Sequence, residues 1–168
     1  MSESMFDPFP ALRALTRHGV RFVVIGGYAA SLRGSPVVTG DLDICYARDD
    51  VNFEHLAAAL QELRARLRGP AVPRDIPFIL DAETIRNGDH FTFITDAGSL
   101  DCLGTPSGTS GFKDLDSGAD AFSVDGMQVR VASVDDLIRM RQASARVKDH
   151  SHLIHLRSLR DEIEREEG

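Results

Sequence analysis

The 168-residue sequence has few cysteines, no long hydrophobic run and no excess of positive charge. Two cysteines, Cys45 and Cys102, are too few for a disulfide framework, so we expect both to be reduced core residues. The apolar runs are too short to cross a bilayer, and the first eight residues lack the basic-then-apolar pattern of a secretory signal. These absences predict a cytoplasmic protein that has no membrane partner.

The formal net charge is −7, which argues against a non-specific nucleic-acid binder. Positive charge is concentrated between residues 130 and 160, and most of these side chains are expected on solvated helix faces. The hydrophobic content of 42% is enough for a sizeable core. Residues 1–168 are therefore expected to form a single domain.

Strand and helix patterns alternate along the chain, with two hairpins among them. Strands are expected at 21–25, 41–45, 90–95, 99–103, 122–124 and 127–131. Helices are expected near 9–18, 28–33, 50–68, 78–86, from 134 onward, and at 149–164. This order predicts an α+β domain with a mixed β-sheet, flanking helices and a C-terminal helical segment that closes a cleft.

Asp41 and Asp43 stand two residues apart in an expected strand, so both carboxylates point to the same face. Paired carboxylates repel unless one keeps its proton or a cation intervenes. Oxygen ligands at this spacing suit Mg²⁺, whose shell is completed by water and phosphate oxygens. A solvated strand end is the plainer alternative.

Gly26 and Gly27 end the apolar strand 21–25 and precede a short helix. A strand, a glycine turn and a helix start leave backbone N–H groups free to hold an anion, although such a pair is often only a tight turn. A third carboxylate, Asp101, lies within the second strand of the first hairpin. It is either an edge residue facing water or a third metal ligand and general base.

Gly26-Gly27, thirteen further residues, Asp41-Leu42-Asp43 and the later Asp101 resemble the signature of the DNA polymerase β-like nucleotidyltransferase superfamily. The chain is most similar to the minimal bacterial branch, which includes AbiEii-type toxins, and the likeness covers nearly the whole sequence. The resemblance implies the nucleotidyltransferase fold. It also implies Mg²⁺-dependent transfer of a nucleoside monophosphate from an NTP to a hydroxyl or phosphate, with release of pyrophosphate.

The resemblance also assigns roles to residues. Two Mg²⁺ ions would be held by three carboxylates, which are Asp41, Asp43 and Asp101. The nucleotide would be held by six further residues, which are Gly26, Gly27, Ser31, Thr39, Arg141 and Lys148. Of these, Thr39 is expected to orient the Asp41 loop through hydrogen bonds. Arg141 and Lys148 are expected to neutralise charge in the transition state.

Two positions differ from the family pattern. Val37 stands where the family often has arginine, and Arg141 stands where it often has lysine. Arginine keeps the charge but cannot donate a proton at neutral pH. These differences favour an alternative: a non-catalytic nucleotide- or protein-binding member of the fold, such as one component of a toxin–antitoxin pair. For the enzyme, the acceptor is left open among tRNA, a protein side chain and a small molecule.

Overall fold

One mixed sheet of seven strands forms the centre of the protein, in the order β3-β4-β5-β2-β1-β7-β6. The computed structural model describes residues 6–36, 39–68, 80–144 and 150–167. The strands are β1 (Phe22–Ile25), β2 (Leu42–Tyr46), β3 (Arg66–Leu67), β4 (His90–Thr95), β5 (Gly98–Leu103), β6 (Asp120–Val124) and β7 (Met127–Val131). Neighbours β1 and β7, and β2 and β5, run parallel, and the other pairs are antiparallel.

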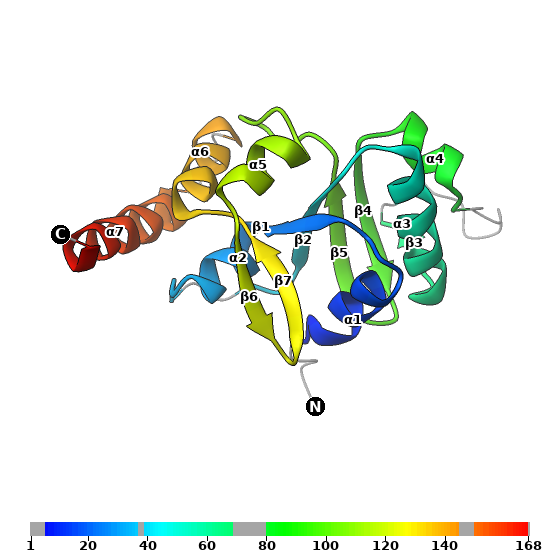
Figure 1. Cartoon of the computed structure of the whole chain (residues 1–168), viewed down its shortest axis with the longest axis horizontal. Coiled ribbons are helices and arrows are strands. Elements are labelled where there is room, and N and C mark those ends of the chain that lie inside the picture. Colours follow the sequence, from blue (N-terminus) through cyan, green and yellow to red (C-terminus); the bar gives the residue numbers. More distant parts are fainter. Residues whose placement is uncertain (1–5, 37–38, 69–79, 145–149, 168) are drawn as a thin grey trace.

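Helices flank this sheet (Figure 1). They are α1 (Phe9–Arg17), α2 (Gly26–Leu32), α3 (Asp50–Glu62), α4 (Ala82–Asn87), α5 (Phe112–Gly118), α6 (Val134–Ser144) and α7 (His150–Glu167). The expected α+β class and mixed sheet are thereby confirmed. No helix in the described part of the chain is long and apolar enough to span a bilayer.

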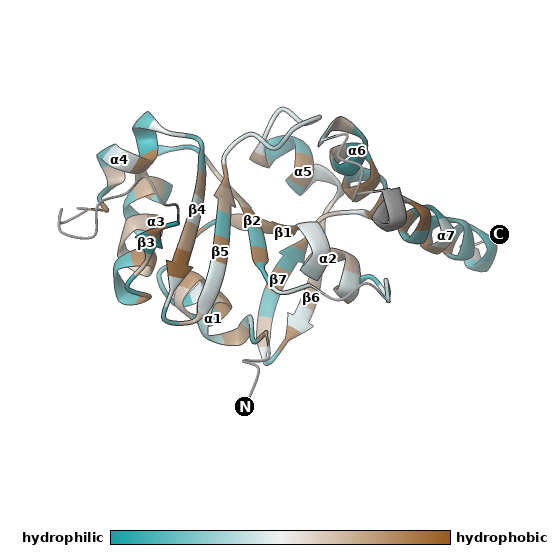
Figure 2. Ribbon diagram, turned by 180° about the vertical axis from the view of Figure 1, so that it is seen from behind, coloured by the Kyte–Doolittle hydropathy of each residue, from teal (hydrophilic) through white to brown (hydrophobic). Residues whose placement is uncertain are grey.

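The C-terminal helix α7 packs along α6 and projects away from the sheet (Figure 1). Hydrophilic residues predominate towards its free end, whereas hydrophobic residues concentrate in the central strands (Figure 2). Among residues 154–166 of α7, Leu156 is buried. The predicted C-terminal helical segment is present, but it was expected to close a cleft. Instead it extends outward, and its described residues line neither the carboxylate cavity nor the larger cavity beside it.

The central strands β1, β2 and β5 carry many fully buried side chains. All four residues of β1 are buried, because this strand has sheet neighbours on both sides and helices packed against it. In β2 and β5, Ile44 and Cys102 are fully buried register partners. On the opposite face of the same two strands, Asp43 and Asp101 are only half-buried.

Helix α3 ends earlier than the sequence suggested. We expected it to continue to Gly69-Pro70, but it stops at Glu62. Arg64 adopts a left-handed backbone with φ of 55°, and the N–H of Ala65 donates to the carbonyl of Leu60. This hydrogen bond is the Schellman helix ending, which usually has glycine in the left-handed position. Because arginine occupies that position here, no glycine marks the end of the helix in the sequence.

Other boundaries follow the patterns more closely. Both hairpins form as expected, and the second turns at Asp125-Gly126, where both residues have positive φ. The short helix expected at 78–86 appears as α4, which begins after its cap, Asp81. Helix α5 was not predicted at all. Its short, mixed sequence shows little apolar periodicity, and its N-cap is Gly111.

Both cysteines are free and fully buried. Ile44 pairs with Cys102 and Cys45 pairs with Leu103 in the β2–β5 register, so the two thiols face opposite sides of the sheet. Burial raises the pKa of the Cys45 thiol to about 12, with further contributions from Asp89 and Asp114. Both cysteines are thus core residues on opposite faces of the sheet, as predicted, and their reduced state stays a prediction.

Candidate active site

The predicted carboxylates surround a cavity of about 400 Å³ above the central strands. Its lining comes from the end of β1, the start of α2, strands β2, β4 and β5, the loop after β5, and α6. The residues predicted for the site that line this cavity are Gly26, Gly27, Thr39, Asp41, Asp43, Asp101 and Arg141. The structure thus brings together side chains that are up to about a hundred residues apart in the chain.

Asp43 and Asp101 occupy matched positions on neighbouring parallel strands. They are direct register partners in the β2–β5 ladder, so their side chains stand side by side on one face. Asp41 lies just before β2, and its charge acts on both of the other carboxyls. The three carboxylates therefore form one acidic group, with Asp43 and Asp101 as its core.

Gly26 is the point at which the backbone of α2 meets this acidic group. Its φ is +70°, and a Cβ atom added there would lie 2.1 Å from Oδ2 of Asp43. A side chain at this position would therefore be strained by its backbone angle and would also overlap the carboxylate. The glycine is required because the Asp43 carboxylate packs directly against the start of α2.

Thr39 connects Gly27 with Asp41. A Cβ atom on Gly27 would lie 2.8 Å from Cβ of Thr39, so the threonine also packs against bare backbone. The Thr39 hydroxyl donates to the Asp41 carbonyl at 3.2 Å, and the Asp41 N–H lies 3.4 Å from the same hydroxyl oxygen. These contacts fix the bend that leads into β2 and so hold Asp41 beside Asp43.

Burial and mutual repulsion make this group reluctant to ionise. Burial, together with the charges of Asp101 and Asp41, raises the pKa of Asp43 to about 7, although Arg141 acts in the opposite direction. Burial and Asp41 also raise the pKa of Asp101, while His90 and Thr92 favour its charged form. Without a cation, the cluster therefore holds a proton near neutral pH.

Arg141 contributes a cation to this cavity from α6. Ser133 precedes that helix, and its hydroxyl accepts the Asp136 N–H at 3.1 Å, as the capping pattern predicted. Helix α6 also places Met140 and Ser144 in the lining. The other cationic candidate, Lys148, lies outside the described residues, as does Val37.

Ser31 is the predicted nucleotide-binding residue that the structure places elsewhere. It lies one turn beyond Gly27, and the helical rise carries it about 6 Å further along α2. Its side chain is exposed and lines a larger, neighbouring cavity instead. The predicted phosphate contact from Ser31 is therefore not supported.

Sequence reasoning missed His90, Pro106 and Ser107, which also line the carboxylate cavity. Thr92 pairs with Asp101 in the β4–β5 hairpin, and His90 lies two residues away on the same face. Strand alternation in the hairpin was a signal that could have found His90. Pro106 and Ser107 belong to the turn-rich loop after β5, for which the sequence pattern gives no placement.

The carboxylates fit a cation, as one orphaned atom shows. Oδ1 of Asp101 is buried and has no hydrogen-bond partner, an arrangement that is costly unless a positive ion approaches. Two adjacent carboxylates match the oxygen preference of Mg²⁺. However, residues 6–36, 39–68, 80–144 and 150–167 contain no group of three or more His, Cys, Asp or Glu side chains that could hold a metal ion. The three-carboxylate metal site therefore stays a prediction.

Comparisons with known proteins bear on the fold. No family model matches the chain, and no curated protein matches its sequence. The structure is similar to the lincomycin-bound lincosamide antibiotic adenylyltransferase LnuA, with a TM-score of 0.59 and 14% identity, covering 90% of this chain and 94% of that one.

Two structures of the antibiotic-resistance factor ANT(2'')-Ia are also similar. Its solution structure has a TM-score of 0.57 and 15% identity, covering 92% of this chain and 81% of that one. Its complex with adenylyl-2''-tobramycin has a TM-score of 0.54 and 15% identity, covering 92% and 86%. Identities this low establish the fold alone, and that fold is the one shared by these nucleotidyltransferases.

Proposed function

We propose that this protein transfers a nucleoside monophosphate from an NTP to an acceptor hydroxyl or phosphate and releases pyrophosphate. The observation that carries the proposal is the side-by-side placement of Asp43 and Asp101 against the bare backbone of Gly26. A half-buried carboxylate pair that lacks a cation is destabilising, so a fold that keeps one has a use for the charge. The nucleotidyltransferase fold supports the same reading.

Mg²⁺ is the cation that we assign to this pair, and we propose two ions, as the family resemblance implies. Asp43 and Asp101 would hold the metal, and Asp41 would join them when the NTP phosphates supply the remaining oxygens. Bound Mg²⁺ neutralises phosphate charge and stabilises the entering and leaving oxygens of an in-line displacement. This assignment does not require a preformed site of three ligands.

The chain's own residues then have the following proposed roles. The acceptor oxygen attacks the α-phosphorus, the bond from that phosphorus to the bridging oxygen breaks, and pyrophosphate leaves. Asp101 takes the proton from the acceptor oxygen, a role that suits its raised pKa. The backbone of Gly26 and Gly27 contacts the phosphates, and Arg141 offsets their charge.

Lys148 remains a proposed phosphate contact on the family pattern alone. If it acts in the transition state, Lys148→Ala lowers turnover more than nucleotide affinity. A single charged contact of that kind is worth roughly 2–4 kcal/mol, or a rate factor of about a hundred to a thousand. Wild-type turnover in the variant would remove Lys148 from the site.

For the acceptor, the neighbouring structures favour a small molecule over tRNA or a protein side chain. One of them holds lincomycin, and another holds adenylyl-2''-tobramycin. The net charge of −7 also disfavours a long polyanion as acceptor. The identity of the NTP is left to experiment.

A non-catalytic binding protein of the same fold is the second candidate. Among the described residues, the lack of any three-ligand metal group favours it. In that role the chain would bind a nucleotide or a partner such as a cognate antitoxin, without chemistry. The AbiEii-type likeness is the basis for the antitoxin and stays a prediction.

A thermal-shift experiment tests whether the protein binds a nucleotide at all. The melting temperature is measured with Mg²⁺ alone and with Mg²⁺ plus ATP, GTP, CTP or UTP. We expect one Mg²⁺–NTP to raise it in the wild type and not in Asp43→Asn or Asp101→Asn. Asp161→Asn, on the outer part of α7, is the charge-matched control and should respond as the wild type does. If no NTP changes the melting temperature, both the transferase and a non-catalytic nucleotide-binding protein are contradicted.

A further inference from the structure

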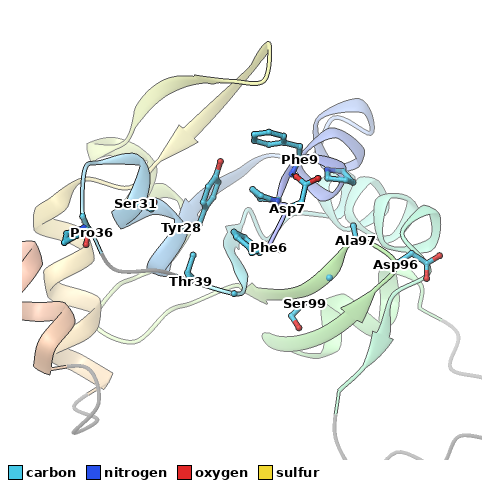
Figure 3. Close-up of a pocket in the computed structure, with 15 residues that line it drawn as sticks. Phe6, Asp7, Phe9, Tyr28, Ser31, Pro36, Thr39, Asp96, Ala97 and Ser99 are labelled. Carbon is cyan, nitrogen blue, oxygen red and sulfur yellow. The ribbon is translucent and has the colours of Figure 1, made fainter. Parts of the chain in front are cut away.

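A second cavity, of about 1000 Å³, lies beside the carboxylate cavity and is larger than it. Its walls come from residues 6–10 at the start of α1, from α2 and the segment after it, and from the turn of the β4–β5 hairpin. Figure 3 shows these three parts of the chain around one open space. The volume matches that of sites for drug-sized molecules.

Aromatic and proline side chains form the apolar part of this cavity. Phe6 and Tyr28 project towards its interior, and their rings meet edge to face with centroids 5.7 Å apart (Figure 3). Phe9 lies on another wall and is 36% exposed, which is high for a large hydrophobic residue. Phe6 and Tyr28 are partly buried, and aromatic rings that line a cavity bind ring compounds and also attract cations.

The charge of the cavity is negative. Asp7 and Asp96 are among the lining residues, and no Lys or Arg is among the described residues that line it. Asp7 accepts the Phe9 N–H and acts on Tyr28, whose phenol pKa is raised by burial and by that charge. Asp96 Oδ2 lies 3.7 Å from Nε of Arg64, and Arg64 itself is not part of the lining. Asp7 is thus the carboxylate available to a ligand, and a phosphate group would be repelled.

The two cavities meet at Thr39. This residue lines both of them, and Gly40 in the larger cavity directly precedes Asp41 in the smaller one. A Cβ atom on Gly40 would meet nothing within 4 Å, so the passage over this residue is open. A molecule seated between Phe6 and Tyr28 can therefore extend a hydroxyl group over Gly40 towards the carboxylates.

We propose that the larger cavity binds the acceptor, and that this acceptor is a hydroxylated ring compound that carries an ammonium group. The ring packs on Phe6 and Tyr28, the ammonium group faces Asp7, and the hydroxyl group passes Thr39 towards Asp41. The role of the bound molecule as acceptor rests on the proposed function, whereas the binding site itself does not depend on it.

Three probes that share a naphthyloxy ring and a hydroxyl group but carry a positive, a neutral or a negative end group test the site. Propranolol has a naphthalene ring, a hydroxyl group and an ammonium group; 3-(1-naphthyloxy)-1,2-propanediol replaces the amine with a neutral hydroxyl; and 3-(1-naphthyloxy)-2-hydroxypropanoate replaces it with a carboxylate. Dissociation constants are measured by amide chemical shifts. We expect shifts at Gly40, Ala97 and Gly98, and about fivefold tighter binding of the amine than of the diol. The carboxylate should bind more weakly than the diol.

Two variants locate the charge and the ring contacts. Asp7→Asn should bring the amine and diol within twofold of each other, because asparagine still accepts the Phe9 N–H but has no charge. Phe6→Ala should weaken all three probes alike. Asp161→Asn is the charge-matched control and should change nothing. Absence of binding, equal binding of amine and carboxylate, or shifts confined to the carboxylate cavity would each overturn the inference.

Asp43→Asn separates this inference from the proposed function. The variant should bind propranolol as the wild type does and should lose the response to Mg²⁺–NTP. If the amine binds as expected but no NTP is bound or used, the cavity assignment stands and the transferase proposal fails. If transfer is detected but Asp7→Asn leaves probe selectivity unchanged, the acceptor class is wrong and the transferase proposal stands.

Discussion

Replacing Asp43 with asparagine should stabilise the metal-free protein, and more so at high pH. The carboxyl of Asp43 has a pKa of about 7 in the folded protein against an ordinary value of 3.8, because of burial and its acidic neighbours. A carboxyl with a raised folded pKa holds its proton more tightly when folded than when unfolded. Its contribution to stability is complete below pH 4 and is lost as the pH rises from about 4 to about 7.

The size of the effect follows from the shift. Three pKa units correspond to about 4 kcal/mol, at 1.36 kcal/mol for each unit. At pH 5 the loss in the wild type is only about 1–2 kcal/mol, and at pH 8 it is nearly complete. Asparagine has the same shape, keeps a donor towards Asp101 and does not titrate. The advantage of Asp43→Asn should therefore grow by about 2–3 kcal/mol between pH 5 and pH 8.

Urea unfolding at the two pH values, in a chelating buffer, measures this difference. Asp161→Asn on α7 is the control, and its offset from the wild type should stay within about 0.5 kcal/mol at both pH values. If Asp43→Asn is less stable than the wild type at pH 8 without metal, Asp43 has a structural role and the repulsion argument is wrong. Adding Mg²⁺ with the preferred NTP should reverse the order, because only the wild type binds them.

Three further experiments test other parts of the site and core. Gly26→Ala should lower the free energy of unfolding in urea by more than about 2 kcal/mol, because the φ of Gly26 is +70° and a Cβ would meet the Asp43 carboxylate. The control Gly40→Ala should lower it by under about 0.5 kcal/mol, because a Cβ there meets open space. Arg141→Ala should weaken Mg²⁺–NTP binding and move its pH midpoint upward, since Arg141 lowers the Asp43 pKa; an unchanged midpoint would separate the two residues. Thiol titration should find two groups in denatured, unreduced protein and none in native protein, because Cys45 and Cys102 are fully buried.

The parts of the fold that the sequence predicted are those with a local signal. Strand alternation placed Asp101 and Cys102 on opposite faces of the first hairpin. The capping residue Ser133 located the start of α6, and the turn at Asp125-Gly126 marked the second hairpin. Each of these features is decided within a few residues of the chain.

The parts that the sequence did not predict depend on contacts between distant segments. The stop of α3 at Glu62 relies on a left-handed arginine, which no propensity favours. Helix α5 has no strong pattern of its own and is placed by its contacts with β1. The large cavity brings Phe6 together with Ala97, and nothing in either segment indicates that the other is near.

For the carboxylate cavity, the sequence predicted most of the residues that line it, but it misplaced Ser31 and missed His90. Asp43 and Asp101 share a register position, which strand parity permitted but could not fix. Helical rise places Ser31 on the larger cavity, although its type and spacing suited a phosphate cradle. His90 entered the lining through the hairpin register, which is a tertiary feature.

Label transfer tests the central claim most directly. The protein is incubated with Mg²⁺ and each NTP, labelled at either the α- or the γ-phosphate, together with the small-molecule fraction of a cell extract. We predict that the α-label moves to an acceptor while the γ-label is released in pyrophosphate. With Asp43→Asn, neither labelled acceptor nor labelled pyrophosphate should form. Binding of Mg²⁺–NTP without any movement of the α-label, even with the whole extract as acceptor, would contradict the transferase assignment and support a binding protein of the same fold.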